Sequence, residues 1–371
     1  MKEERKRILK LVEEGKMTVD EALFLIEQLE QGGTQHQEKS TALSTNVKFE
    51  EAKKEEFKKD DFTAYNFNSV KDKVLDFVDS AFKKIKDFDL DLNFGQSIDI
   101  THIFQQGDVN LNQADFDIAN GSVKVVPWEQ KDVRVECSAK VYRVENQDEA
   151  RRKFLEDAIF TIENQKLRFS VQQKWMKVDA VIHIPKEEYD NVRLRLFNGS
   201  IEGENLKVKD CRAKTANGKV VFENLECGKL EMETVSGQIS IQRSAIRDLE
   251  VETINGAIKA EGYFNHVDLQ SFNGNVACTV NNQDCESVEV KATTGSIEVY
   301  LPEKTPASGE LKSNLGGFTI ELDGIQVVEE KSDMVQKNLR FKPADGGQKA
   351  VRLHADTKTG SILVKKRIQQ Q

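Results

Sequence analysis

Most of the chain alternates apolar and polar positions with the period of two that marks half-buried β-strands. From about residue 98 the alternation is clear, as in the run Val133, Val135, Cys137, Ala139 and Val141. It returns at residues 167–171 and 178–184, whereas residues 147–157 have the spacing of one short helix. The pattern predicts a mainly β domain over residues 96–371.

A glycine recurs in this region at near-constant spacing, usually after Asn. The steps between seven successive copies are 19, 19, 19, 18, 21 and 21 residues. The copies are Asn198-Gly199, Asn217-Gly218, Ser236-Gly237, Asn255-Gly256, Asn273-Gly274, Thr294-Gly295 and Leu315-Gly316, with outlying copies at Asn120-Gly121 and Thr359-Gly360. A fixed period near twenty residues indicates stacked structural units. It also lowers the odds of an enzyme, because the repeated residues serve architecture.

Alignment of the copies on Gly separates inward from outward columns. Positions seven and five residues before Gly, and two and four residues after it, are mostly apolar, so each unit has one strand on each side of Gly. A third apolar segment follows as Leu206/Val208, Leu225/Cys227, Ile246 and Tyr263. Three short strands in about nineteen residues predict one turn of a β-solenoid, similar to a right-handed β-helix.

A string of hairpins, or a sandwich, is the alternative. Asn-Gly is a strong signal for a two-residue hairpin. Ser236, Thr294 and Leu315 replace Asn in three copies, however, and tolerate the positive φ of a type I′ turn poorly. We therefore favour the solenoid, in which Asn side chains stacked at one bend would hydrogen-bond to each other along the stack.

The first 95 residues have a different pattern. Residues 1–31 read as a helical hairpin, with Thr18 and Glu21 as a capping box for the second helix. Two helices this short cannot bury a core alone, which predicts packing or self-association through residues 1–31. Residues 32–66 are rich in Lys, Glu and Gln and read as a flexible linker.

Residues 67–95 contain an amphipathic helix. Its apolar stripe includes Val70, Val74, Phe77, Val78, Phe82 and Ile85. The opposite face carries five Lys and five Asp, whereas helices that lie on membranes are usually net basic. Packing on a partner or on the β domain is therefore favoured over contact with a membrane surface, and both stay open.

Composition narrows the function classes. With 371 residues and a formal charge of −9, the chain lacks the overall basic character that phosphate binding requires, so we expect no nucleic acid partner. No stretch approaches the roughly 18 apolar residues that span a bilayer, and the charged N-terminus has no apolar signal core. These features predict a cytoplasmic protein, with membrane association or surface exposure as alternatives.

The sequence offers little catalytic chemistry. The five cysteines are odd in number and lack a CxxC pair, and Cys137, Cys211, Cys227 and Cys278 fall on inward columns. The five histidines are scattered, and no phosphate-binding glycine loop, nucleophile elbow or HExxH motif occurs. We expect no cofactor, no metal and no catalytic residues.

The outward columns carry a change of charge. Six and four residues before Gly, two successive units place the basic residues Arg193, Arg195, Arg212 and Lys214. The next two units place the acidic residues Glu231, Glu233, Glu250 and Glu252. Like charges on neighbouring strands repel. A cation or a cationic peptide would relieve the acidic group, whereas the simpler interpretation is a solvated face.

The repeat, with Ile184-Pro185-Lys186 and Tyr189 just before its first copy, resembles the bacterial "putative adhesin" family of β-strand repeat domains. Residues 15–22, Gly-Lys-Met-Thr-Val-Asp-Glu-Ala, resemble the SHOCT-like helical module found ahead of that domain. The combination is similar to the YvlB/LiaX-like group of Gram-positive bacteria. The resemblance covers roughly residues 1–31 and 98–365.

This resemblance implies a role in the cell-envelope stress response. Members are encoded beside membrane proteins of the phage-shock kind, and some sense cationic peptides that act on membranes. We therefore expect a non-enzymatic binding or scaffold protein whose partners are a membrane protein of that kind, a membrane surface or cationic peptides. The alternatives are a β-helix enzyme acting on polysaccharide, disfavoured by the short, uniform connections of residues 190–300, and a cell-surface adhesin.

Overall fold

The computed structural model describes residues 96–332, 336–345 and 350–367. The helical hairpin expected at residues 1–31, the linker at 32–66 and the amphipathic helix at 67–95 lie outside the described residues. The described part is mainly β, as the alternation predicts, and α4 is its one helix.

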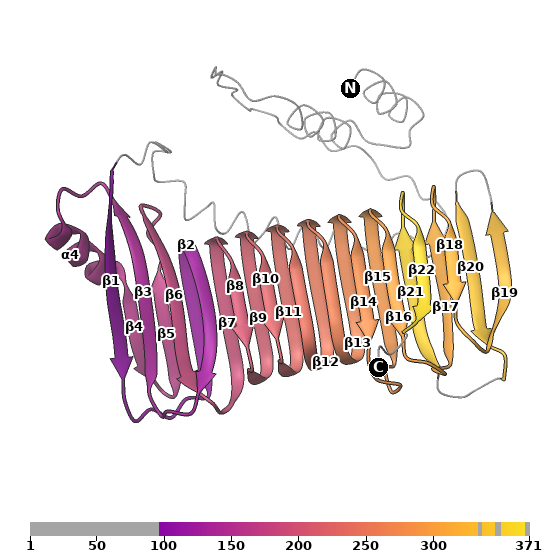
Figure 1. The fold of residues 1–371 in the computed structure, drawn as a ribbon, viewed down its shortest axis with the longest axis horizontal. Helices are drawn as coiled ribbons and strands as arrows, with labels where there is room; N and C mark the ends of the chain where they lie inside the picture. Colours follow the sequence, from indigo (N-terminus) through magenta and orange to yellow (C-terminus); the bar gives the residue numbers. More distant parts are fainter. Residues whose placement is uncertain (1–95, 333–335, 346–349, 368–371) are drawn as a thin grey trace, which may run out of the picture. The chain divides into compact units, whose positions relative to one another are not determined.

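The strands and the helix fall into three groups along the chain (Figure 1). The first group is β1 (Ser97–Gln106), β2 (Gln113–Trp128), β3 (Val133–Tyr142), α4 (Gln147–Asp157), β4 (Ile159–Glu163), β5 (Lys166–Val171) and β6 (Met176–Pro185). The second is β7 (Glu188–Asn198), β8 (Ile201–Glu204), β9 (Lys207–Asn217), β10 (Val220–Glu223), β11 (Glu226–Ser236), β12 (Ile239–Asn255), β13 (Ile258–Asn273), β14 (Val276–Val280), β15 (Ser287–Thr294) and β16 (Ile297–Leu301). The third is β17 (Ala307–Ser313), β18 (Phe318–Glu321), β19 (Ile325–Ser332), β20 (Lys337–Pro343), β21 (Val351–Thr357) and β22 (Ile362–Lys366).

The second group is a stack of parallel strands in which each repeat adds one rung. Asn191 on β7 pairs with Asp210 on β9, and Asp210 pairs with Lys229 on β11. The short strands after Gly pair in the same way, as Ile201 with Val220 and Val220 with Ile239. Neighbouring repeats are thus parallel rather than antiparallel, which the hairpin alternative does not allow. Their inward columns form one continuous apolar core.

The sequence predicts that the third apolar segment of each repeat is a separate strand, but in the structure it is part of a longer strand. Val208 and Cys211 lie on the same strand β9 and are both buried although they are three residues apart. The alternation therefore resets at Lys209-Asp210, and a single long strand carries both segments around a bend. Tyr263 was wrongly assigned to the core: it is 56% exposed, and Phe264 is buried instead.

Close approach of the backbone explains the glycine column. A Cβ placed on Gly237 would lie 2.0 Å from the carbonyl oxygen of Gly218 on the preceding rung, and the φ of Gly237 is +157°. Any other residue would both clash and take up a rare backbone conformation. The preceding Asn side chains form the expected ladder, since Asn217 Nδ2 donates to Asn198 Oδ1 at 2.8 Å and Asn198 Nδ2 to Asn120 Oδ1 at 2.9 Å.

A second ladder, not predicted, runs inside the stack three residues before Gly. The Thr215 hydroxyl donates to the carbonyl oxygen of Gly199 at 3.0 Å, and the Ser271 hydroxyl donates to that of Gly256 at 3.0 Å. These buried hydroxyls give the glycine carbonyls a hydrogen bond where the chain turns.

The two ends of the stack depart from the simple repeat. At the N-terminal end β1, β3 and β6 pair antiparallel, and β6 then pairs in parallel with β2. Helix α4 covers this end, with Asn146 as its N-cap and Phe154 buried. Its bounds agree with the predicted 147–157.

The C-terminal rungs are not stacked in sequence order, which corrects the linear repeat read from the glycines. Strand β21 lies between β15 and β17, and β22 lies between β16 and β18 (Figure 1). The Thr359-Gly360 copy therefore occupies the rung between Thr294-Gly295 and Leu315-Gly316. Strand β20 then continues the sheet antiparallel to β17, and β19 pairs antiparallel with β20.

Candidate binding face

The outward face of the long-strand sheet carries the charged rows that the sequence singled out. We call it the charged face: the positions six and four residues before Gly on β2, β7, β9, β11, β12, β13 and β15. They alternate with buried positions such as Leu194 and Met232, so their side chains leave the core side of the sheet.

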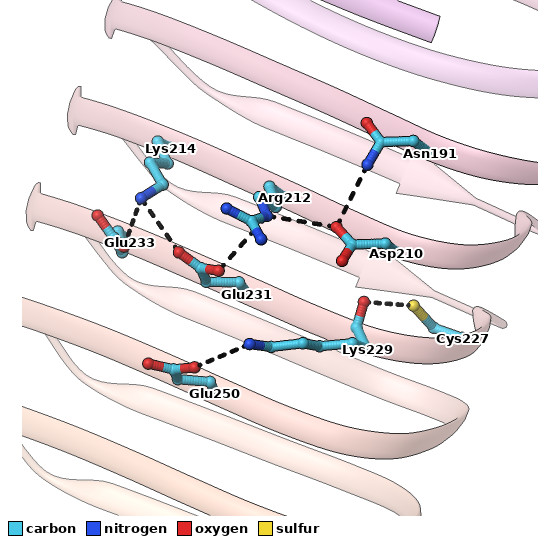
Figure 2. A network of polar contacts seen from close by, with 9 residues as sticks. All are labelled: Asn191, Asp210, Arg212, Lys214, Cys227, Lys229, Glu231, Glu233 and Glu250. Carbon is cyan, nitrogen blue, oxygen red and sulfur yellow. Dashed lines mark hydrogen bonds and ion pairs between the residues drawn. The ribbon is translucent and has the colours of Figure 1, made fainter. Parts of the chain in front are cut away.

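The basic and acidic groups are not two separate patches but meet along one seam. Lys214 Nζ on β9 lies 3.1 Å from Glu231 Oε1 and 2.6 Å from Glu233 Oε1 on β11. Arg212 Nε lies 3.5 Å from Glu231 Oε2, and all of these contacts join neighbouring rungs (Figure 2). The opposite charges of neighbouring strands therefore neutralise each other at this boundary.

The other basic residues face acidic partners too. Arg195 lies 3.1 Å from Asp117 Oδ2 on β2. Arg212 also contacts Asp210 at 3.3 Å, and Asn191 donates to the same carboxylate (Figure 2). Arg193 is exposed in the same row on β7.

The pKa values of the two seam carboxylates, Glu231 and Glu233, shift in opposite directions. Glu233 is 4% exposed, and its Oε2 has no hydrogen-bond partner in the described part of the chain. Burial raises the pKa of Glu233, and the adjacent Glu231 carboxylate adds to the rise against the effect of Lys214. For Glu231 burial acts in the same direction, but hydrogen bonding and charge from Lys214, with Arg212, lower its pKa overall.

The acidic row continues past the four glutamates. Lys229 Nζ approaches Glu250 at 3.5 Å, and Glu252 is 4% exposed on the same strand β12. Asp268 and Glu289 occupy the equivalent position on the next two rungs. Burial raises the pKa of Asp268, and the carboxylates of Glu289 and Glu250 add to that rise. Sequence reasoning missed both residues, although the column six before Gly already contained them.

The continued row lines a shallow hollow of about 430 Å³. Its lining includes Lys229, Asp248, Glu250, His266, Asp268 and Glu289. A second hollow of about 560 Å³ shares Ser287 and Glu289 with it and runs on to Arg340, Lys342, Arg352 and His354. The second hollow thus adds basic residues beside the carboxylates of Glu289 and Glu310 toward the C-terminal rungs.

Comparison with known proteins places this architecture in a family. The family model for Toastrack DUF4097 matches residues 111–357, and a SHOCT-like domain model matches residues 3–34. The chain belongs to the Toastrack DUF4097 family. It is 50% identical over 370 residues, 98% of this chain and 99% of the relative, to the uncharacterized protein YvlB of Bacillus subtilis (strain 168).

The solved structures that match the chain are much more distant in sequence. A putative adhesin from Bacteroides fragilis is 13% identical, with a TM-score of 0.43 over 72% of this chain and 97% of its own. A putative lipid binding protein from Parabacteroides distasonis is 11% identical, with a TM-score of 0.33 over the same shares.

The thiols of this Toastrack domain are structural. All five cysteines are free and buried. Burial raises the pKa of Cys137 and of Cys227 to about 12 and that of Cys285 to about 11, so none is a thiolate at neutral pH. In the described ranges, no three His, Cys, Asp or Glu side chains gather in a way that could hold a metal ion. Nor does any helix there have the length and apolar character to cross a bilayer.

Proposed function

We propose that the chain is a non-enzymatic binding scaffold of the cell-envelope stress response, built on a β-solenoid. The parallel, in-register pairing of successive repeats supports the solenoid, because the segments before and after each glycine pair in parallel with those of the preceding repeat. The proposed partners are a membrane protein of the phage-shock kind, a membrane surface or a cationic peptide. The proposed location is the cytoplasm, at the membrane.

The observation that carries this proposal is the acidic row over four successive rungs. Glu231, Glu250, Asp268 and Glu289 are neighbours across β11, β12, β13 and β15. Glu231 is engaged by Arg212 and Lys214, Glu250 by Lys229 and Glu289 by Lys291, whereas Asp268 accepts hydrogen bonds from the neutral Gln270, so the acidic character is strongest around Asp268. An extended basic segment lying across the rungs would meet one carboxylate about every 4.8 Å.

The raised pKa of Asp268 supports the same conclusion. A half-buried carboxyl beside two other carboxylates is destabilised as an anion. A bound ammonium or guanidinium group would relieve this repulsion, and binding energy would come from the relief. Such a site favours basic partners over neutral ones.

The test is a triple substitution with a matched control. Glu250→Gln/Asp268→Asn/Glu289→Gln removes the row, whereas Glu202→Gln/Glu204→Gln/Glu223→Gln removes three exposed carboxylates from the opposite sheet. Binding of a lysine-rich amphipathic peptide should weaken about tenfold or more in the first variant, at a few tenths to 1 kcal/mol per ion pair, and less than twofold in the second. Equal affinities of both variants would refute a site on this row.

The membrane-protein partner needs a separate experiment. A crosslinked pull-down from envelope-stressed cells, performed with the full chain and with a chain lacking residues 1–95, should recover the membrane partner only with the full chain. Equal recovery by both would remove the proposed role of the helical segments while leaving the acidic row untouched.

A further inference from the structure

The C-terminal rung is inserted out of order between two rungs that could stack directly. Strand β21 pairs in parallel with β15 on one side and with β17 on the other, and β22 does the same between β16 and β18. The rung of residues 351–366 therefore lies between two rungs that follow one another in the sequence. We call it the inserted rung.

The flanking rungs have matching inner surfaces. Thr357 on the inserted rung donates to the carbonyl oxygen of Gly295 at 2.9 Å, and Ser313 on the last rung donates to that of Gly360 at 2.9 Å. Both are the hydroxyl three residues before a repeat glycine. Ser313 could thus make with Gly295 the contact that Thr357 makes now.

The chain also has the length for direct stacking. The step from Gly295 to Gly316 is 21 residues, the same as the step from Gly274 to Gly295, which spans one ordinary rung. The connection from β16 to β17 covers residues 302–306, one residue shorter than the connection from β14 to β15, which joins adjacent rungs. A link that now crosses two rungs can therefore cross one.

Outer charges favour the inserted order. Asp356 lies between Lys291 on β15 and Lys312 on β17, whereas direct stacking would bring the two lysines together. Glu289 and Glu310 would become neighbours in the same way. The order of synthesis favours direct stacking first. Residues 307–321 are made before residues 351–366, so they can dock on β15 and β16 earlier.

We propose that the inserted rung is exchangeable between copies of this chain. When residues 351–366 leave, the emptied slot has two fates: the last rung closes onto β15 and β16 of its own chain, or the same segment of a second copy enters the open slot. The occupant fits because it has the sequence that fills the slot within one chain, which is the basis of domain swapping. The result is a dimer joined by two exchanged rungs.

Disulfide trapping in the full chain distinguishes the arrangements. Ser296 and Ser361 are adjacent, with their Oγ atoms 3.3 Å apart, so S296C/S361C reports the inserted order. Gly317 lies one strand beyond Ser361, about 10 Å from Ser296 at two strand spacings, too far for a disulfide unless the rung has left. S296C/G317C therefore reports direct stacking, and N275C/S361C, at the same two-rung separation, controls for general loosening. The five native thiols are buried in the folded chain but exposed during refolding, so each crosslink is assigned by peptide mapping to the two introduced cysteines.

During refolding, we expect S296C/G317C to crosslink at least threefold more than N275C/S361C. A yield equal to that control would overturn the closed arrangement. For exchange, chains carrying S296C alone and S361C alone are refolded together, and a disulfide-linked heterodimer is expected, with N275C plus S361C as the control mixture. Intramolecular trapping without any heterodimer would overturn the exchange between copies.

Discussion

Glycine is required at the repeat position because the backbones of neighbouring rungs come into contact there, and not only because the chain turns. The Asn-Gly pairs suggested a bend, but the structure shows that the glycine must also pass within contact of the carbonyl of the rung before it. Ser236 and Thr294 can replace Asn because that side chain only adds one ladder hydrogen bond. The glycine has no such substitute at positions such as Gly237.

Gly237→Ala should therefore lower the free energy of unfolding by about 3 kcal/mol, because its Cβ would lie only 2.0 Å from the Gly218 carbonyl oxygen and its φ is unfavourable. Urea denaturation of the full chain measures the loss. Gly317→Ala is the matched control, because nothing lies within 4 Å of its added methyl group. Similar losses in both variants would contradict the close-approach explanation.

The seam carboxylates should affect stability with opposite pH dependence. The raised pKa of Glu233 means that its contribution is present below the pKa of the unfolded side chain and is lost as pH rises through the folded value. The lowered pKa of Glu231 gives a contribution that is present at neutral pH and is lost as pH falls. Relative to the parent, Glu233→Gln should gain stability between pH 4 and 8, whereas Glu231→Gln should lose it. Unfolding free energies across this range measure both, and parallel curves would show that the two carboxyls are not distinguished by burial.

At the scale of elements, strand phase could be read from the sequence, but strand order could not. The alternation of apolar and polar residues predicts which side chains point inward, and those of Val192, Leu194 and Ile201 are buried as predicted. The continuity of β9 around its bend was hidden because Val208 and Cys211 give the same apolar signal as two separate strands. The place of the inserted rung could not be predicted because Gly316 and Gly360 both fit the repeat-glycine position. Periodicity does not say which of their two rungs stacks directly on the rung of Gly295.

Anchoring at the C-terminal end should control the inserted rung. Arg367 Nη2 lies 3.1 Å from Glu261 Oε1, its side chain also reaches Asn281, and its backbone N–H donates to Leu301. Arg367→Ala removes the side-chain anchor and should raise the rate of S296C/G317C crosslinking about fivefold. Arg340→Ala is the control, since Arg340 pairs with Glu329 between β20 and β19, which move together. An unchanged rate with Arg367→Ala would show that these contacts do not hold the rung.

At the scale of the molecule, the charged face is a series of bands that no single repeat contains. Asp115 and Asp117 face Arg195 on β7, the basic residues of β9 face β11, and the acidic row from β11 to β15 follows. The sequence shows by position where the column changes from basic to acidic residues. It could not show that the seam is internally neutralised, because ion pairing depends on side-chain direction across rungs. Because Lys291 also pairs with Glu289, the acidic character available to a partner is displaced toward Asp268.

If the carboxylates of the acidic row hold a basic peptide, its affinity must depend strongly on salt concentration. Carboxylates at the surface of a shallow hollow are screened when the Debye length falls from about 14 Å at 0.05 M salt to about 4 Å at 0.5 M. The full chain should therefore bind a lysine-rich peptide at least tenfold more weakly at the higher salt concentration. In Glu250→Gln/Asp268→Asn/Glu289→Gln most of that dependence should disappear, because the charges that produce it are gone. Titration of the peptide at several salt concentrations measures both slopes. A binding constant that is indifferent to salt in the parent chain would mean that apolar contacts, not the acidic row, hold the peptide.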